Sequence, residues 1–164
     1  MFDQVLSFKP SAYRARAVPQ VPARARPRDT NGLIKVKSAY PVDQTIDRLK
    51  KAIAAKGIPF FGALDQARLA AGAGVKLHPS TLLVFGAPSL GAQFLSSNPY
   101  AGLDWPIRLL VLQDSTGAVW VAYTDFKWIA RRRGIADLQE QTALVTAVVD
   151  SIASTVRGRS RWWS

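Results

Sequence analysis

The pattern of hydrophobic and polar positions divides the chain into short segments of period two and longer segments of helical period. Residues 33–40 alternate, with Ile34 and Val36 on one face and lysines on the other, which predicts a half-buried strand. From Val42 onward, apolar positions recur every three or four residues. This spacing predicts a helix that ends at Gly57, since glycine is the usual residue just beyond a helix C-terminus.

The next segment predicts two strands, each followed by a short helix. Residues 58–64 are apolar and aromatic, and Asp65 then stands where a helix N-cap is expected, ahead of a small-residue helix that Gly74 closes. Residues 81–85 form an unbroken apolar run, so we expect a central strand that is covered on both faces. A brief helix carrying Phe94 follows and ends at an Asn-Pro pair.

The C-terminal half predicts a hairpin and two helices. Strand-like runs at 107–113 and 119–124 are joined by a turn that contains aspartate and glycine. A cationic helical turn follows and breaks at Gly134, after which Asp137 is expected to cap a long amphipathic helix. The apolar side of that helix carries Leu138, Val145, Val148, Val149, Ile152 and Val156.

Together these elements predict the fold class and the domain boundaries. We expect one α+β domain over residues 32–156, with an antiparallel-rich sheet of about five strands covered mainly by the helices at 42–56 and 137–156. Residues 1–31 form a basic extension rich in proline and arginine, and residues 157–164 form a basic, aromatic tail.

Composition excludes several classes of chemistry. The chain has 164 residues, of which 48% are hydrophobic and 20% charged, and this balance suits a folded domain. It contains no cysteine, which excludes disulfides, thiolate metal sites and cysteine nucleophiles. Its single histidine, His78, excludes histidine-rich metal centres. We therefore expect neither a metal nor a cofactor.

The positive charge is concentrated at the two ends of the chain. The formal net charge is +11, of which +4 lies in residues 1–31 and +3 in residues 157–164. Arginine-rich ends most often keep a chain in solution, and binding of nucleic acid or another polyanion through them is an alternative that we do not favour.

No membrane segment is expected from the sequence. The longest stretch without formal charge, from Leu77 to Leu103, is interrupted by several prolines and glycines, so it predicts protein interior. The first 32 residues lack the continuous apolar segment of a secretory signal, and we predict a cytoplasmic protein.

Five motifs resemble a known family. They are Gly57-Ile-Pro-Phe-Phe61, Leu64-Asp-Gln-Ala67, Leu77-His-Pro-Ser-Thr-Leu-Leu-Val-Phe-Gly-Ala-Pro88, Leu103-Asp-Trp-Pro106 and Asp114-Ser-Thr-Gly-Ala-Val-Trp-Val-Ala-Tyr123. In this order they resemble the domain of unknown function 302 family over residues 32–124. The resemblance implies a β-α-β(4)-α type fold and a homodimer, but no chemistry. The family often has histidine after the matched Asp65, whereas this chain has Gln66, so a role for that histidine does not transfer.

Three acid–base candidates define an enzyme hypothesis. Asp65 and Asp104 are carboxylates in apolar surroundings, and His78 is the one available imidazole. A hydrolase- or isomerase-like site requires all three to converge on one cavity. The structural alternatives, which we favour, are an N-cap for Asp65, a turn brace for Asp104 and a hydrogen-bonded loop residue for His78.

Two further segments are candidates for binding. Gly86, Ser89 and Gly91 lie in a strand-to-helix turn whose backbone N–H groups would suit an anion, although the segment lacks the P-loop lysine and the three glycines of a dinucleotide site. Trp128, Arg131 and Arg132 recur at helical spacing and form a mixed aromatic and cationic face that suits nucleic acid or a partner. In both segments, ordinary packing is the favoured alternative. The leading functional hypothesis is therefore a non-enzymatic module that binds an unidentified small ligand or a partner.

Overall fold

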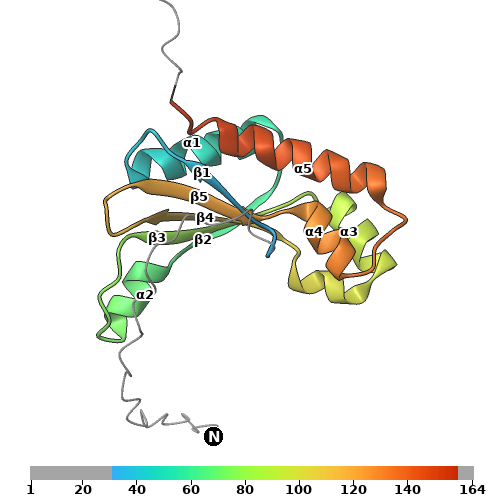
Figure 1. Cartoon of the computed structure of the whole chain (residues 1–164), viewed down its shortest axis with the longest axis horizontal. Coiled ribbons are helices and arrows are strands. Elements are labelled where there is room, and N and C mark those ends of the chain that lie inside the picture. The colour runs from blue at the N-terminus through green and yellow to red at the C-terminus, as the bar shows by residue number, and fades with distance from the viewer. Residues whose placement is uncertain (1–30, 159–164) are drawn as a thin grey trace, which may run out of the picture.

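The computed structural model describes residues 31–158, and they form a five-stranded sheet with long helices over one face and shorter helices beyond both ends (Figure 1). Nearly all of the basic extension and most of the C-terminal tail lie outside the described residues. The strands are β1 Leu33–Lys37, β2 Phe60–Asp65, β3 Ser80–Phe85, β4 Ile107–Gln113 and β5 Val119–Thr124. The helices are α1 Val42–Ala55, α2 Gln66–Gly72, α3 Pro88–Ser97, α4 Phe126–Arg132 and α5 Gln139–Ser154, with a 3-10 helix η1 at Pro99–Leu103.

The sheet places the first strand of the domain beside the last strand. Its strand order is β1-β5-β4-β3-β2, and each neighbouring pair is antiparallel. In this register Val36 of the first strand lies opposite Val121 of the last, and Leu83 lies opposite Leu109 in the middle. The predicted α+β class with an antiparallel sheet is therefore confirmed.

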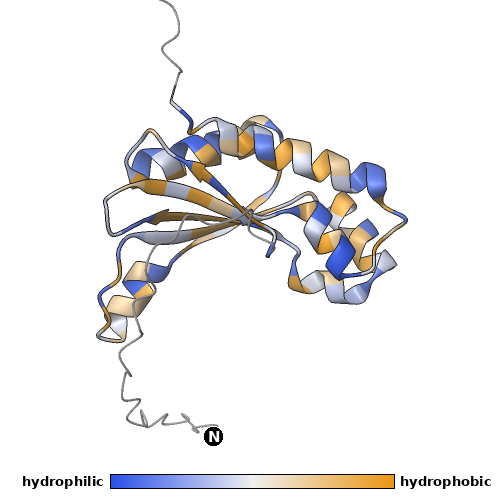
Figure 2. Cartoon of the chain, viewed as in Figure 1, coloured by the Kyte–Doolittle hydropathy of each residue, from blue (hydrophilic) through white to orange (hydrophobic). Residues whose placement is uncertain are grey.

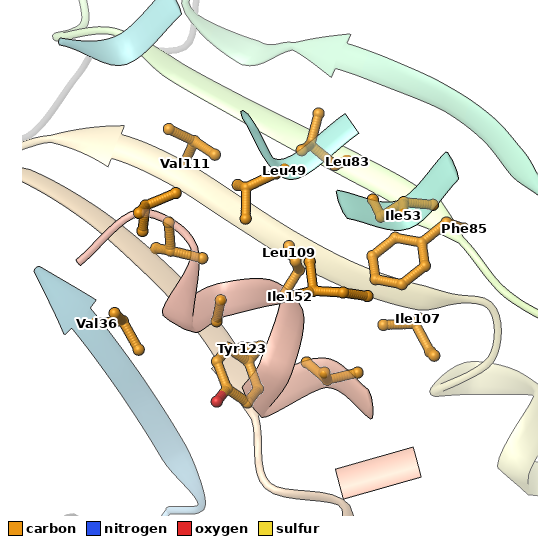
Figure 3. Packing of buried hydrophobic residues seen from close by; sticks show 14 of the residues in the cluster. Val36, Leu49, Ile53, Leu83, Phe85, Ile107, Leu109, Val111, Tyr123 and Ile152 are labelled. Carbon is orange, nitrogen blue, oxygen red and sulfur yellow. The ribbon is translucent and has the colours of Figure 1, made fainter. Parts of the chain in front are cut away.

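The core lies between one face of the sheet and two helices. Alternate strand residues such as Leu83, Leu109 and Val121 are fully buried, and they meet Leu49 of α1 and Ile152 of α5 (Figure 3). Both helices carry hydrophobic residues on the side that meets the sheet, with hydrophilic positions between them (Figure 2). The predicted amphipathic helices thus bury their apolar faces on the same side of the sheet.

The opposite face of the sheet differs from expectation. Strand β3 is an interior strand, as predicted, but the prediction that it is covered on both faces is wrong for the described residues, because α1 and α5 lie on the same side (Figure 1). The six apolar residues that alternate with the core positions define what we call the open sheet face. They are Leu82, Val84, Leu110, Leu112, Trp120 and Ala122. The apolar run at residues 81–85 correctly indicated that both faces of β3 are apolar. A sequence pattern of this kind does not indicate what covers each face.

An aspartate caps α2 and α4, whereas the N-cap residues of α1, α3 and α5 make no side-chain capping bond. Asp65 caps α2 as predicted, and Asp125, for which no cap was predicted, caps α4. Their carboxylates accept hydrogen bonds of 2.9 and 3.0 Å from backbone N–H groups of the first turns. Asp137 does not cap α5; its carboxylate instead accepts a hydrogen bond of 2.8 Å from the Ser97 hydroxyl, and Leu138 is the N-cap. Asp137 therefore links the end of α3 to the connection between α4 and α5, and the prediction that it caps α5 is wrong.

Candidate functional site

A hollow that combines charge with an apolar lining lies between α4 and α5. Asp125 starts α4, and Gly134, with a φ of +64°, turns the chain back at its end toward α5. A positive φ is cheap for glycine alone, so this turn fixes how the two helices approach. The resulting groove has a volume of about 640 Å³. It is lined by Lys127, Ala130, Arg131, Gly134, Ile135, Ala136, Gln139, Thr142 and Ala143.

The groove is cationic on one wall and mainly apolar on its floor. Lys127 and Arg131 are exposed and stand four residues apart on α4, which places both on the same side of that helix. Ala130 and Ile135 are buried beneath them. No side chain among the described residues caps the first turn of α5, whose Gln139 borders the groove. The combination of two cations, a helix start and an apolar floor suits an anion that has an apolar body.

The aromatic and cationic trio predicted from sequence is divided between two sides of α4. Arg131 lines the groove, whereas the guanidinium of Arg132 stacks 5.1 Å from the ring centroid of Trp128. The Trp128 side chain lies against Gly32, where a β-carbon would come within 2.5 Å of the indole. Trp128 therefore packs between the start of β1 and α4, while Lys127 takes its place beside Arg131 in the groove. The spacing of four residues between Lys127 and Arg131 was the available signal for this pair.

Asp104 lies at a second, smaller site between η1 and β4. Its carboxylate pairs with Nε of Arg133 at 2.7 Å and with Arg108 at 3.8 Å. The two cavities that it borders have volumes of about 30 and 20 Å³, which is room for water rather than a substrate. This geometry favours the structural use of Asp104.

The three acid–base candidates do not share a site. Asp65 ends β2 opposite Thr81 at the start of β3, whereas Asp104 precedes Ile107, which pairs with Phe85 at the other end of β3. Four residues of strand separate these ends, or roughly 13 Å. His78 is exposed in the loop before β3. Gln66, at the position where the family often has histidine, accepts a hydrogen bond of 2.8 Å from Ser80.

The glycines of the candidate anion loop have a packing role. A β-carbon at Gly86 or Gly91 would come within 2.7 or 2.1 Å of the Trp105 indole, so both positions require glycine while the ring lies there. The N–H groups of Gly86 and Gly91 donate hydrogen bonds of 3.0 Å to Pro59 and Ala87. Ser89 is exposed near the start of α3. The loop thus holds an indole, and anion binding there stays a prediction.

Residues 31–158 contain neither a cluster of metal ligands nor a helix suited to cross a membrane. Within that range no group of three or more His, Asp or Glu side chains is placed to hold a metal ion. None of the helices there has the length and apolar character that a membrane crossing requires. The arginines proposed to bind polyanions lie mainly outside the described residues, with Arg157 as the exception.

The fold and the comparisons place this chain in a class and then in a family. It is an α+β domain in which a five-stranded antiparallel sheet is covered on one face by two helices. The family model described as "Domain of unknown function DUF302" matches residues 34–152, and the chain belongs to this family. The match continues well past residue 124, where the sequence resemblance ended, and includes α4 and most of α5.

Solved structures and curated proteins are similar to the chain. The crystal structure of an uncharacterized conserved DUF302 protein from Bacillus stearothermophilus superposes with a TM-score of 0.70 at 18% identity, over 77% of this chain and 98% of that one. Proteins named fluoride-specific ion channel FluC 1, from Brucella suis biovar 1 and Brucella abortus biovar 1, are each 34% identical over 105 residues. Those 105 residues are 64% of this chain but only 41% and 39% of the two channel proteins, so this chain spans about two fifths of their length.

Proposed function

We propose that this chain is a non-enzymatic binding module that holds a small organic anion in the groove between α4 and α5. The groove carries the proposal: its volume of about 640 Å³ lies within the usual range of ligand sites, and Lys127 and Arg131 stand over an apolar floor. A carboxylate would pair with the two cations, while an aliphatic or aromatic body would rest on Ala130 and Ile135. The separation of Asp65 from Asp104 supports a binding role over the hydrolase- or isomerase-like alternative.

Calorimetric titration with two probes of nearly equal shape tests this function. Benzoate has a charged carboxylate on an aromatic body, and benzamide has the same body without the charge. We expect benzoate to bind at least tenfold more tightly, because only the anion pairs with Lys127 and Arg131. Equal binding of the two probes, or no binding of either at millimolar concentration, would overturn the proposal.

Two arginine variants provide a matched control in the same helix. Arg131→Gln removes a cation from the groove, whereas Arg132→Gln removes the neighbouring cation that stacks on Trp128. Both side chains are exposed, so neither change should unfold the domain. We expect Arg131→Gln to abolish the preference for benzoate and Arg132→Gln to preserve it. If Arg132→Gln abolished the preference and Arg131→Gln preserved it, the site would lie on the Trp128 side of α4 and the proposed groove would be wrong.

A second candidate function is an accessory part in fluoride handling. The observation that favours it is the 105-residue similarity to proteins named fluoride-specific ion channels. In this case the cations beside the uncapped start of α5 would attract fluoride itself. Titration followed by ¹⁹F NMR tests the idea: fluoride should broaden and shift with the wild-type chain and not with Arg131→Gln. Chloride at equal concentration serves as the control for general anion attraction.

The homodimer and the cytoplasmic location belong to the same proposal. A module without a catalytic centre acts through what it binds, and self-association would place two α4–α5 grooves in one particle. The apolar face opposite the helices supports an associating protein, because such a face is unusual on a lone domain. Light scattering of the full chain at micromolar concentration tests the homodimer directly.

A further inference from the structure

The open sheet face is apolar in its centre, although no described helix lies across it. In an antiparallel sheet with one solvated face, the outward residues are normally polar. Here Leu82 of β3 lies opposite Leu110 of β4, and Val84 and Leu112 are their neighbours on the same two strands. All four side chains are half-buried. Apolar patches that are contiguous over several strands mark interaction surfaces. The face is therefore a candidate interaction surface.

The largest side chain on this face is held in one orientation. The indole N–H of Trp120 donates a hydrogen bond of 2.8 Å to Asp114 at the hairpin turn. The ammonium group of Lys35 lies 4.6 Å from the centroid of the same ring. Tryptophans fixed in this way lose little freedom on association, which is one reason why they dominate interface energetics. Trp120 is thus an anchor that is ordered before a partner arrives.

Two lysines give the face one cationic edge. Lys35 and Lys37 belong to the edge strand β1 and alternate with its core residues. At the opposite edge, β2 places Gly62 and Leu64 on the open side, and neither is charged. Arg108 also lies on this face, at the start of β4 and opposite Val84, and its guanidinium donates a hydrogen bond of 2.7 Å to the carbonyl of Leu103. The face therefore has a cationic edge, a neutral edge and an apolar centre with one arginine at its end.

We propose that a second copy of this chain packs on the open sheet face, with the twofold axis running along β4. This interface rests on the homodimer of the proposed function and says which surface forms it. Rotation about an axis parallel to the strands places β1 of one copy over β2 of the other, so the lysines meet the neutral edge instead of each other. The same rotation places Trp120 of β5 over the smaller side chains of β3, and Leu110 and Leu112 meet their own counterparts. Arg108 of β4 also comes to its counterpart, and each guanidinium is turned back to the Leu103 carbonyl of its own chain.

The size of the face is adequate for such a dimer. Five strands spaced by about 4.8 Å and about 20 Å long give a flat footprint of roughly 500 Å². Side-chain relief increases the accessible area above that value, toward the roughly 600–800 Å² per partner found in specific interfaces. An isologous contact of this kind also closes after two copies, which prevents open-ended assembly.

Single-cysteine variants of the full chain test the geometry. The natural chain has no cysteine, so each variant carries one thiol. Leu110→Cys places it beside the proposed axis, and Leu144→Cys places it on α5, where Leu144 is 55% exposed. Packed sheets lie about 10 Å apart, so a bismaleimide that spans this distance should link two Leu110→Cys chains and leave Leu144→Cys monomeric on a denaturing gel. Equal linking of the two variants would overturn the interface.

Charge substitution and light scattering separate the interface from the homodimer itself. Leu110→Glu leaves a carboxylate solvated in the monomer but buries two facing carboxylates in the dimer. We therefore expect the dissociation constant of the dimer to rise at least about 100-fold. Leu144→Glu is the matched control and should dimerise like the wild type. A wild type that is monomeric at about 100 µM overturns both proposals, because specific interfaces bind in the micromolar range or more tightly. A dimer that Leu110→Glu does not weaken overturns only this interface. If residues 1–30 occupied the face instead of a second copy, the wild type would be monomeric.

Discussion

Arg133 and Asp104 form an ion pair in which Nε lies 2.7 Å from a carboxylate oxygen, and the two side chains are only 15% and 16% exposed. The pair joins the C-cap of α4 to the segment that enters β4. The amide of Asn98 reinforces the same junction by donating a hydrogen bond of 2.7 Å to the Arg133 carbonyl. Since α4 is one wall of the proposed ligand groove, this pair fixes the groove to the sheet.

Breaking this pair should destabilise the protein more than breaking its exposed neighbour. We expect Arg133→Gln to lower the free energy of unfolding by about 1–3 kcal/mol, because it leaves a largely buried carboxylate without its closest partner. A double-mutant cycle with Asp104→Asn, followed by urea denaturation, measures the coupling. The cycle of Asp104 with Arg108, which is 3.8 Å away and 48% exposed, should give less than about 0.5 kcal/mol. Equal coupling in the two cycles would contradict this ranking.

Trp105 explains why two glycines stand in the loop between β3 and α3. Gly91→Ala should destabilise the fold by at least about 1–3 kcal/mol, because the added methyl would come within 2.1 Å of the indole. Gly102→Ala is the matched control, since a β-carbon added there would meet nothing within 4 Å. Urea midpoints of the two variants compare them directly. Similar midpoints would mean that Trp105 moves aside without cost.

Much of the fold followed from periodicity, and the reason is local. The hairpin strands at 107–113 and 119–124 were predicted residue for residue, because alternation, a turn signal and β-branched residues all agree there. The cap at Asp65 was likewise correct, since a capping bond joins residues close in sequence. Asp137 failed because its partner, Ser97, is 40 residues away, and no local pattern encodes that contact.

The candidate site was less predictable because it depends on how separate elements meet. The sequence singled out Arg131 but paired it with Trp128, whose place is set by contact with Gly32 almost a hundred residues earlier. The same limit applies to the loop at Gly86 and Gly91, where the space above the backbone is filled by Trp105 from a later segment. Whether a local motif has free space for a ligand therefore depends on side chains from distant parts of the sequence.

Tyr123 should contribute to stability through its contact with α5. Its hydroxyl donates a hydrogen bond of 2.5 Å to the Asp150 carboxylate, and burial is the main cause of a pKa raised above the usual value of 10.0. Tyr123→Phe should cost about 1–2 kcal/mol of unfolding free energy, whereas Tyr100→Phe, at a residue that is 72% exposed, should cost less than about 0.5 kcal/mol. Because the folded pKa is raised, the contribution of Tyr123 is complete below about pH 10 and declines above it. A Tyr123→Phe variant as stable as wild type at pH 7 would contradict this role.

Asp114 gives the opposite pH dependence at the acid end. Its carboxylate accepts hydrogen bonds from the side chain of Thr116, from the indole of Trp120, and from the backbone N–H groups of Thr116 and Ala118. These bonds, that of the Thr116 hydroxyl above all, lower the pKa of Asp114 to about 2 from an ordinary value of 3.8. A lowered folded pKa stabilises the folded state above the ordinary value, and this stabilisation is lost as the pH falls from about 4 toward 2.

The stability advantage of the wild type over Asp114→Asn should therefore be constant near neutral pH and shrink below pH 4. Urea denaturation at pH 6, 4 and 2.5 measures that difference, and NMR titration of the carboxyl carbon measures the pKa itself. Thr116→Val removes the strongest single cause and leaves the backbone donors, so its Asp114 pKa should lie between the wild-type and ordinary values. If the difference between wild type and Asp114→Asn were the same at every pH, the hairpin carboxylate would not be held in its charged form by these bonds. The orientation of Trp120 on the open sheet face would then need another cause, because the same carboxylate accepts the indole hydrogen bond.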